Sequence, residues 1–307
     1  MELGKTACHA VRRAGRTAVL PALIAGFVAL SVLPVVAETA IPQVPDDIFG
    51  FTSTTGIGDK GDLGFVNEFD GAAGKRDGRY AAYFSKSELG YTFADDWWIA
   101  GSVLVSHHNI RNVPELPDSG ATRFNGITFE LVHRFVERSA SNPLALAVSV
   151  EPFWSPVDGG TGQRADVYGA AFKLFADAVL VPDKLFWGAN AVYAPQRGQD
   201  SADRSTWLSS SLSILSTALT FQLSPGLFAG VEARYLTAYD GTWFDGRLGY
   251  AAYLGPTLLW QASDKLTLSA TWQPQISGRS NDNPGLRYDL DNFERAQFRA
   301  KLSLALN

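Results

Sequence analysis

The nine residues ITFELVHRF, residues 127–135, decide the fold class of this chain. Apolar Ile, Phe, Leu and Phe fall on one side of an extended backbone, while Thr, Glu and Arg lie mostly on the other. The final stretch AQFRAKLSLAL, residues 296–306, repeats this alternation of period two. Both stretches have the length of a tilted membrane-spanning β-strand, about 9–11 residues. They predict strands with one face toward lipid and the other toward a polar interior.

Ten more segments with strand character follow one another at similar spacing. They are residues 63–70, 79–92, 97–110, 144–154, 167–178, 185–194, 207–223, 227–237, 248–260 and 266–276. Together with the two segments above they make twelve strands. An even number is what a bacterial single-chain barrel requires, because both chain ends then lie on the same side of the membrane.

The connections between these segments alternate between short and long. The short, turn-rich connections are 93–96, 181–184, 224–226 and 262–265, and 136–143 is a longer member of the same set. The long connections are 71–78, 111–123, 155–166, 195–205, 238–247 and 277–292. Outer-membrane barrels alternate short periplasmic turns with longer outer loops, whereas a soluble β-sandwich has no reason to do so. The sequence therefore predicts an all-β protein, a transmembrane antiparallel up-and-down β-barrel of about 12 strands.

The amino-terminal end carries the features of a secretory signal peptide. Four basic residues precede an apolar run over residues 18–36, and the small residue Ala37 suits signal peptidase. We expect cleavage after Ala37, with an uncleaved membrane anchor as the alternative. The predicted organisation is a signal peptide (1–37), a periplasmic N-terminal segment (38–60) and an outer-membrane β-barrel (61–307). The middle segment lacks a strand pattern, and one arrangement open to it is to tuck into the barrel mouth.

Removal of this leader changes the chemistry that the chain can perform. It takes away the only cysteine, Cys8, which excludes disulfides, Cys-ligated metals and a Cys nucleophile. It also leaves 22 basic against 30 acidic residues, so nucleic acid is not an expected partner. We expect the outer membrane of a Gram-negative bacterium as the location. The expected partners are outer-membrane lipid, lipopolysaccharide and the barrel-assembly machinery, with a small solute as a candidate ligand and no cofactor.

Assigning the apolar face of each strand to lipid sends a set of charged side chains toward the lumen. These predicted pore-lining residues are Lys86, Glu88, Glu130, Arg134, Lys173, Asp177, Glu232, Arg234, Arg295, Arg299 and Lys301. One interpretation is a wet pore whose basic final strand attracts anions. The other is that opposite charges pair across neighbouring strands and fill the lumen. Strand count does not decide between them.

Histidine and tryptophan supply the remaining candidates. His107 and His108 point to opposite faces of one strand, so they do not share a metal ion. Ser106 and His108 share a face, which raises a hydrolase at the outer rim, but a polar girdle residue is the preferred interpretation of His108. The acidic outer loops fit no calcium-binding spacing, and we predict neither metal ligands nor catalytic residues. Seven tryptophans near strand ends suggest interfacial girdles: Trp97, Trp98, Trp154, Trp187, Trp207, Trp260 and Trp272.

Residues 49–61, which run from FGFT to GDKG, and residues 74–80 resemble the opening of a family of uncharacterised proteobacterial outer-membrane proteins. The general layout is similar to that of barrels associated with the MetA pathway of phenol degradation. The resemblance implies fold and location and does not imply a substrate. The favoured function is a porin-like passive channel or transporter for small solutes. A closed structural or adhesive barrel is the alternative, and an outer-membrane hydrolase is the least favoured one.

Overall fold

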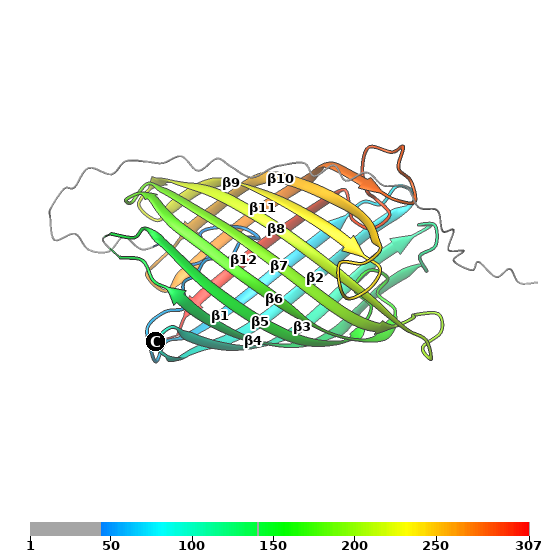
Figure 1. Cartoon of the computed structure of the whole chain (residues 1–307), viewed down its shortest axis with the longest axis horizontal. Helices are drawn as coiled ribbons and strands as arrows, with labels where there is room; N and C mark the ends of the chain where they lie inside the picture. Colours follow the sequence, from blue (N-terminus) through cyan, green and yellow to red (C-terminus); the bar gives the residue numbers. More distant parts are fainter. Residues whose placement is uncertain (1–43, 140, 307) are drawn as a thin grey trace, which may run out of the picture. The chain divides into compact units, whose positions relative to one another are not determined.

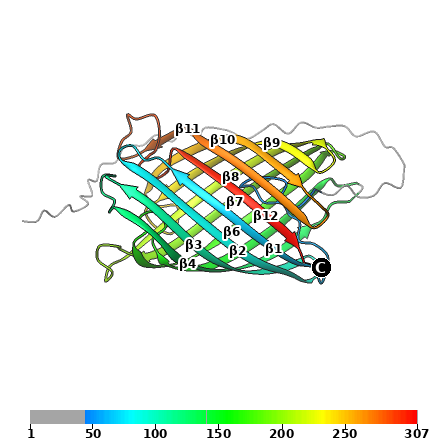
Figure 2. The ribbon, with the colours of Figure 1, turned by 180° about the vertical axis from the view of Figure 1, so that it is seen from behind.

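The computed structural model describes residues 44–139 and 141–306, which form one closed antiparallel barrel (Figure 1). The strands are β1 (Leu63–Ala73), β2 (Arg79–Ala94), β3 (Trp97–Arg111), β4 (Ser119–Val136), β5 (Leu144–Val157), β6 (Arg164–Val181), β7 (Leu185–Gln199), β8 (Trp207–Ser224), β9 (Leu227–Tyr239), β10 (Arg247–Gln261), β11 (Leu266–Ser280) and β12 (Ala296–Ala305). Each strand pairs with the next, and β1 pairs with β12 to close the sheet (Figure 2). No helix in the two described ranges is long and apolar enough to cross a membrane. The predicted signal peptide lies outside these ranges.

The predicted fold class is confirmed, and several strands are longer than the sequence pattern indicated. The alternation predicted a strand over residues 127–135, whereas β4 covers Ser119–Val136. The extra residues pair with β3, with Arg123 opposite Ser106. An alternating apolar pattern marks only the part of a strand whose outer face is apolar, but backbone hydrogen bonds continue beyond it.

The barrel wall is apolar outside and polar inside. Phe129, Leu215 and Trp272 face outward and are each more than half exposed. Glu232 and Gln273 face inward and are fully buried. This distribution is the reverse of that in a water-soluble protein and suits a barrel surrounded by lipid.

The two ends of the barrel differ in their connections. At one end, here called the turn end, lie the beginning of β1, the end of β12 and the connections 95–96, 137–143, 182–184, 225–226 and 262–265. At the opposite loop end lie 74–78, 112–118, 158–163, 200–206, 240–246 and 281–295. The predicted alternation holds, and the connection 137–143 is the longer member of the turn-end set, as expected.

Residues 44–60, here called the plug, fold into the barrel at the turn end. Ile48 and Phe49 are fully buried and pack in a cluster with side chains of β6, β7, β8, β9 and β10. The Phe49 ring fits against Gly188, where a β-carbon would come within 2.4 Å of the ring. Gly50 packs equally closely against Thr271 and Glu232. Glycine at these two positions therefore lets the plug approach the wall.

Candidate functional site

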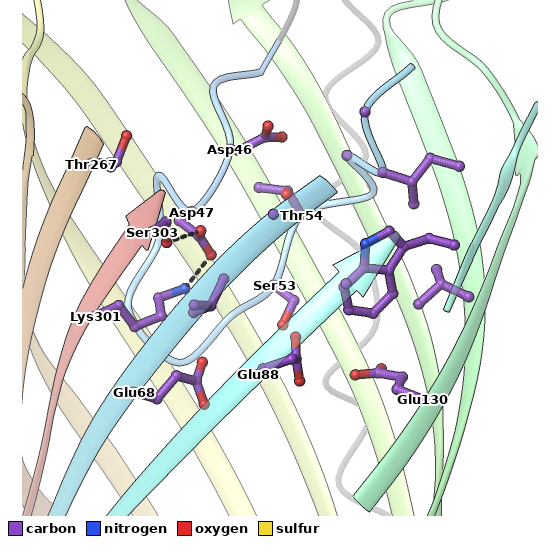
Figure 3. A pocket seen from close by; sticks show the side chains of 18 of the residues that line it. Asp46, Asp47, Ser53, Thr54, Glu68, Glu88, Glu130, Thr267, Lys301 and Ser303 are labelled. Carbon is purple, nitrogen blue, oxygen red and sulfur yellow. Dashed lines mark hydrogen bonds and ion pairs between the residues drawn. The ribbon is translucent and has the colours of Figure 1, made fainter. Parts of the chain in front are cut away.

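The interior contains a cavity of about 1110 Å³ whose wall carries many charged side chains. The cavity begins at the turn end, beside the plug and the 262–265 turn, and continues to the middle of the barrel wall. Eleven acidic and seven basic side chains line it, which gives a net charge of −4. Figure 3 shows acidic side chains of the plug and of the wall around this space.

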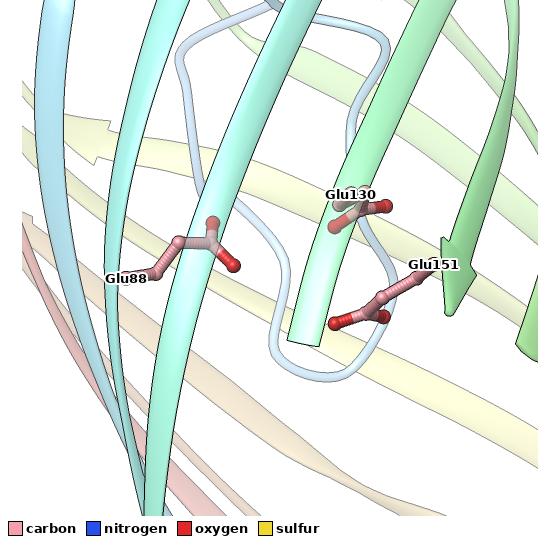
Figure 4. Close-up of side chains that lie close together, drawn as sticks. All are labelled: Glu88, Glu130 and Glu151. Carbon is pink, nitrogen blue, oxygen red and sulfur yellow. The ribbon is translucent and has the colours of Figure 1, made fainter. Parts of the chain in front are cut away.

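Three glutamates and two lysines form an ion-pair cluster on the cavity wall. Glu88 of β2, Glu130 of β4 and Glu151 of β5 each offer a carboxylate oxygen within 4.8 Å of the other two (Figure 4). Lys86 Nζ lies 2.8 Å from an oxygen of Glu88 and 2.8 Å from an oxygen of Glu151. Lys173 Nζ lies 2.9 Å from Glu130 and 2.5 Å from Glu151. The five ionised groups carry a net charge of −1.

Two serine hydroxyls add to this cluster. Ser102 Oγ donates to Glu88 Oε2 at 2.9 Å, and Ser149 Oγ donates to Glu130 Oε1. All five charged side chains are less than a fifth exposed. Charges this well enclosed are stable only when they are paired and hydrogen-bonded. Loss of one member therefore leaves a partner uncompensated.

A second cavity of about 400 Å³ lies between this cluster and the loop 158–163. The two cavities share Leu104, Thr128 and Glu151 as lining residues. Glu151 of the charge cluster therefore borders both spaces, one reaching the turn end and the other reaching toward the loop end.

Two loops fold inward at the loop end. In the loop 158–163, the Gly160 carbonyl accepts a hydrogen bond from Tyr80 Oη at 3.0 Å, and the Gly159 carbonyl lies 2.9 Å from His108 Nε2. In the loop 281–295, the buried Phe293 packs in a cluster with inward side chains of β9 and β10. These loops narrow the barrel opposite the plug.

The plug is held by hydrogen bonds to buried carboxylates of the wall. Glu232 accepts the backbone N–H of Phe51 at 2.9 Å and both the N–H and the hydroxyl of Thr52. Asp177 accepts the backbone N–H of Thr55 at 2.5 Å and also pairs with Arg138. A carboxylate that receives several donors is well placed to anchor an irregular backbone that lacks a strand partner.

Ion pairs and an aromatic ring add to these anchors. Asp47 of the plug lies 2.7 Å from Lys301 Nζ and accepts the Ser303 hydroxyl at 2.5 Å, as drawn in Figure 3. The Phe51 ring contacts two guanidinium groups, with Arg234 at 3.8 Å and Arg299 at 4.8 Å from the ring centre. Each contact is a favourable cation–π interaction.

The charges of the final strand are paired. Arg299 contacts Asp70 at 2.6 Å and Glu68 at 3.3 Å, and Lys301 contacts the plug. Arg295, just before β12, donates to the Gln275 carbonyl and stacks on Tyr288. These contacts agree with the interpretation that inward charges pair across strands, and the final strand does not present a row of unpaired cations.

The structure places the charged residues singled out in the sequence as follows. Seven line the main cavity: Lys86, Glu88, Glu130, Arg134, Lys173, Arg299 and Lys301. Asp177, Glu232 and Arg234 contact the plug. Arg295 lies toward the loop end. Their role in a pore remains a prediction.

The prediction that His108 belongs to a polar girdle was wrong. His108 is fully buried inside the barrel, because the register of β3 turns it toward the inward loop 158–163. Its Nε2 carries the proton that bonds the carbonyl, and neither His108 Nδ1 nor Ser106 Oγ has a hydrogen-bond partner within the described residues. A serine–histidine pair is therefore not assembled. Trp98 also departs from the predicted girdle, since it packs inside the barrel against Ile57 of the plug.

Two carboxyl groups of the plug, both outside the strands, have shifted pKa values. Asp46 borders the cavity, but the surrounding protein removes part of its hydration, and together with the charge of Asp47 this raises the Asp46 pKa to about 6. Burial of Asp47 acts in the same direction, yet Lys301 and Ser303 outweigh it and lower the pKa of Asp47. Asp46 and Asp47 therefore gain and lose their protons in different pH ranges.

Residues 43–306 match the family of unknown function DUF6662. The chain belongs to this family. No curated protein sequence matches it. The COG4313 outer membrane channel from Pseudomonas putida F1 is 12% identical, with 88% of this chain and 100% of that chain covered and a TM-score of 0.53. That likeness shows the fold, which is that of an outer-membrane barrel.

Two further solved structures are similar at lower scores. The β domain of the Bordetella autotransporter BrkA is 15% identical, with 80% of this chain and 99% of that chain covered and a TM-score of 0.47. The NanC porin is 12% identical, with 80% and 100% covered and a TM-score of 0.45. Membership of a family of unknown function agrees with the resemblance to uncharacterised outer-membrane proteins that the sequence shows. The similarity to barrels of the MetA pathway of phenol degradation stays a prediction.

Sequence reasoning did not find the anchors of the plug. Asp47, Thr52 and Thr55 lie in a segment without periodicity, so no pattern indicated what they contact. One signal was available: Ile48 and Phe49 are adjacent large apolar residues in an otherwise polar, non-strand segment. Such a pair needs burial, and the barrel interior is the nearest place for it.

Proposed function

We propose that this protein is an outer-membrane channel for small solutes and that its lumen favours cations. The observation that carries the proposal is the pair of cavities that meet at the Glu–Lys cluster and together reach from the plug to the loop 158–163. A barrel whose only role is structural gains nothing from a water-accessible space lined by charges. Rings of charged side chains are a common means of selecting ions.

The proposed orientation follows from the connections. Short turns and both chain ends face the periplasm in outer-membrane barrels, so the turn end and the plug are assigned to the periplasmic side. The loop 158–163 then faces the outside. In this arrangement a solute meets the inward loops first, the charge cluster next and the plug last.

The cation preference departs from the anion preference expected of a basic final strand. The lining has a net charge of −4, and Arg299 and Lys301 are already neutralised by neighbouring carboxylates. A lumen with excess negative charge raises the local concentration of cations and lowers that of anions. The charge balance of the whole wall, rather than one strand, therefore sets the preference.

A closed structural barrel is the second candidate, and the plug is the observation that favours it. The plug is anchored through Glu232, Asp177 and Lys301 and occupies the turn end. If the plug never leaves, it permanently fills part of the turn end and restricts the opening of the cavity on the periplasmic side.

Reconstitution into planar lipid bilayers tests the proposal. The refolded protein, checked for a gel mobility that changes on boiling, is measured in a KCl gradient. The proposed function is supported by discrete conductance steps whose reversal potential has the sign of the K⁺ equilibrium potential. A folded barrel that gives no steps under any voltage supports the closed structural candidate instead.

A further inference from the structure

The Glu–Lys cluster keeps carboxylate oxygens available. The lysines and serines bond to Oε2 of Glu88, to Oε1 of Glu130 and to both oxygens of Glu151. Within the described residues, no hydrogen bond reaches Oε1 of Glu88 or Oε2 of Glu130. Both side chains line the main cavity, where a ligand can approach those oxygens.

A buried hydroxyl without a partner lies in the same cross-strand row as Glu88. Thr128 is 7% exposed, and its Oγ1 has no hydrogen-bond partner among the described residues. The register places Thr128 opposite Ser102, and Ser102 opposite Glu88, so the three stand in one row across β4, β3 and β2. Thr128 also lines both cavities at their junction. A ligand stabilises a buried hydroxyl in this position if the hydroxyl oxygen can coordinate it or accept a hydrogen bond from it.

We propose that Glu88, Glu130 and Thr128, together with Glu151, bind one small cation at the junction of the two cavities. The three carboxylates and two ammonium groups of the cluster leave a net charge of −1, which a protonated amine neutralises and a divalent ion changes to +1. Carboxylate and hydroxyl oxygens suit a hard metal ion such as Ca²⁺, and equally a protonated amine that donates hydrogen bonds. The inference deepens the proposed function and rests on it, because a site at this junction selects what passes.

The lysines give this site its selectivity. Lys86 and Lys173 occupy both oxygens of Glu151, so Glu151 contributes negative potential rather than a free ligand atom. A second cation would meet two ammonium groups within the same cluster. The site therefore holds one cation and does not accumulate several.

Direct binding measurements test this site independently of conductance. The folded protein in detergent micelles is titrated with CaCl₂ and, separately, with methylammonium chloride by isothermal titration calorimetry. One saturable site per chain is expected; saturation by Ca²⁺ alone assigns a metal ion, by methylammonium alone an amine, and by both a site general for small cations.

Three variants sharpen the test. Glu130→Gln removes one charged ligand and is expected to weaken binding about tenfold or more, because hydrogen bonds to charged groups contribute about that factor. Thr128→Val keeps shape and charge and is expected to weaken binding a few-fold, about the value of one neutral contact. Glu115→Gln removes a charge from the exposed loop 112–118 and is expected to leave binding unchanged. Gel mobility before and after boiling confirms that each variant is folded.

The outcomes separate this inference from the proposed function. Absence of saturable binding in the wild type, or equal affinity in wild type and both cluster variants, overturns the cation site. A barrel that conducts but does not bind either cation keeps the channel and loses the site. A barrel that binds one cation in the expected variant order but gives no conductance keeps the site and loses the channel.

Discussion

Replacing Phe49 by Ala perturbs the plug at its most buried side chain. Phe49 is fully buried, packs with Ile48 and Phe186, and lies against Gly188. Removing a buried phenyl ring destabilises a core by about 3–5 kcal/mol. Because about 1.4 kcal/mol corresponds to a factor of ten, the undocked population is expected to rise roughly a hundredfold to several thousandfold. The barrel strands keep their own hydrogen bonds and remain folded.

Thiol labelling measures that population. Residues 38–307 contain no cysteine, so in a protein that begins at Glu38 the change Thr54→Cys introduces a single thiol on the plug, and a maleimide attached to a polymer too large for the cavity labels it only after undocking. The labelling rate then follows the undocked fraction when docking is fast relative to labelling. Phe135→Ala is the matched control, because Phe135 is a lipid-facing phenylalanine of β4.

A labelling rate unchanged by Phe49→Ala would show that apolar burial does not hold the plug. A second perturbation makes the result specific. Gly188→Ala places a β-carbon 2.4 Å from the Phe49 ring without altering the plug sequence, and it is expected to accelerate labelling as well. An increase in both plug variants together with an unchanged control supports a docked plug that opens as a unit.

Three further predictions concern charges. Glu232→Gln weakens the acceptor for the Phe51 and Thr52 N–H groups and is expected to raise the same labelling rate about tenfold; an unchanged rate would show that these bonds do not hold the plug. Docking favours protonated Asp46, whose pKa rises from 3.8 to about 6, so the labelling rate, divided at each pH by that of the same thiol in the urea-unfolded protein to remove the effect of thiolate ionisation, is expected to increase from pH 4 to pH 6 and to level off above; Asp46→Asn should remove the dependence of this ratio, and its persistence would assign it elsewhere. Arg299→Ala leaves Asp70 and Glu68 without their cation, which is expected to shift the reversal potential further toward cations and lower the urea midpoint; no change in either would remove Arg299 from the conducting wall.

The sequence predicted the architecture because a barrel wall has a strict two-residue repeat. Glu130 and Arg134 fall on the polar face of the alternating stretch, and both line the cavity. The number of strands and the alternation of connections followed from the same repeat. The strand ends at the loop end could not be predicted in this way, because backbone pairing there continues through polar residues on both faces.

The candidate site could be predicted only as a set of inward charges. Which charges meet depends on the register between neighbouring strands, and the sequence does not specify it. Glu88 and Glu151 lie on strands separated by β3 and β4, and Lys86 bridges them across the interior of the barrel. The inward direction of His108 follows from the two-residue alternation of β3, but its burial depends on the loop 158–163 that covers it.

The sign of the lumen potential was the least predictable feature. Counting the basic residues of the final strand suggested anion attraction, but Asp70, Glu68 and Asp47 neutralise them from β1 and the plug. The net potential is a property of the closed barrel and depends on which side chains share its interior.

The most direct test of the central claim is the reversal potential of single channels in a tenfold KCl gradient. We expect discrete conductance steps whose reversal potential has the sign of the K⁺ equilibrium potential. A reversal potential with the sign of the Cl⁻ equilibrium potential would contradict the assignment of the acidic cavity to the conducting path. A folded barrel without conductance steps would contradict the proposal that the protein is a channel.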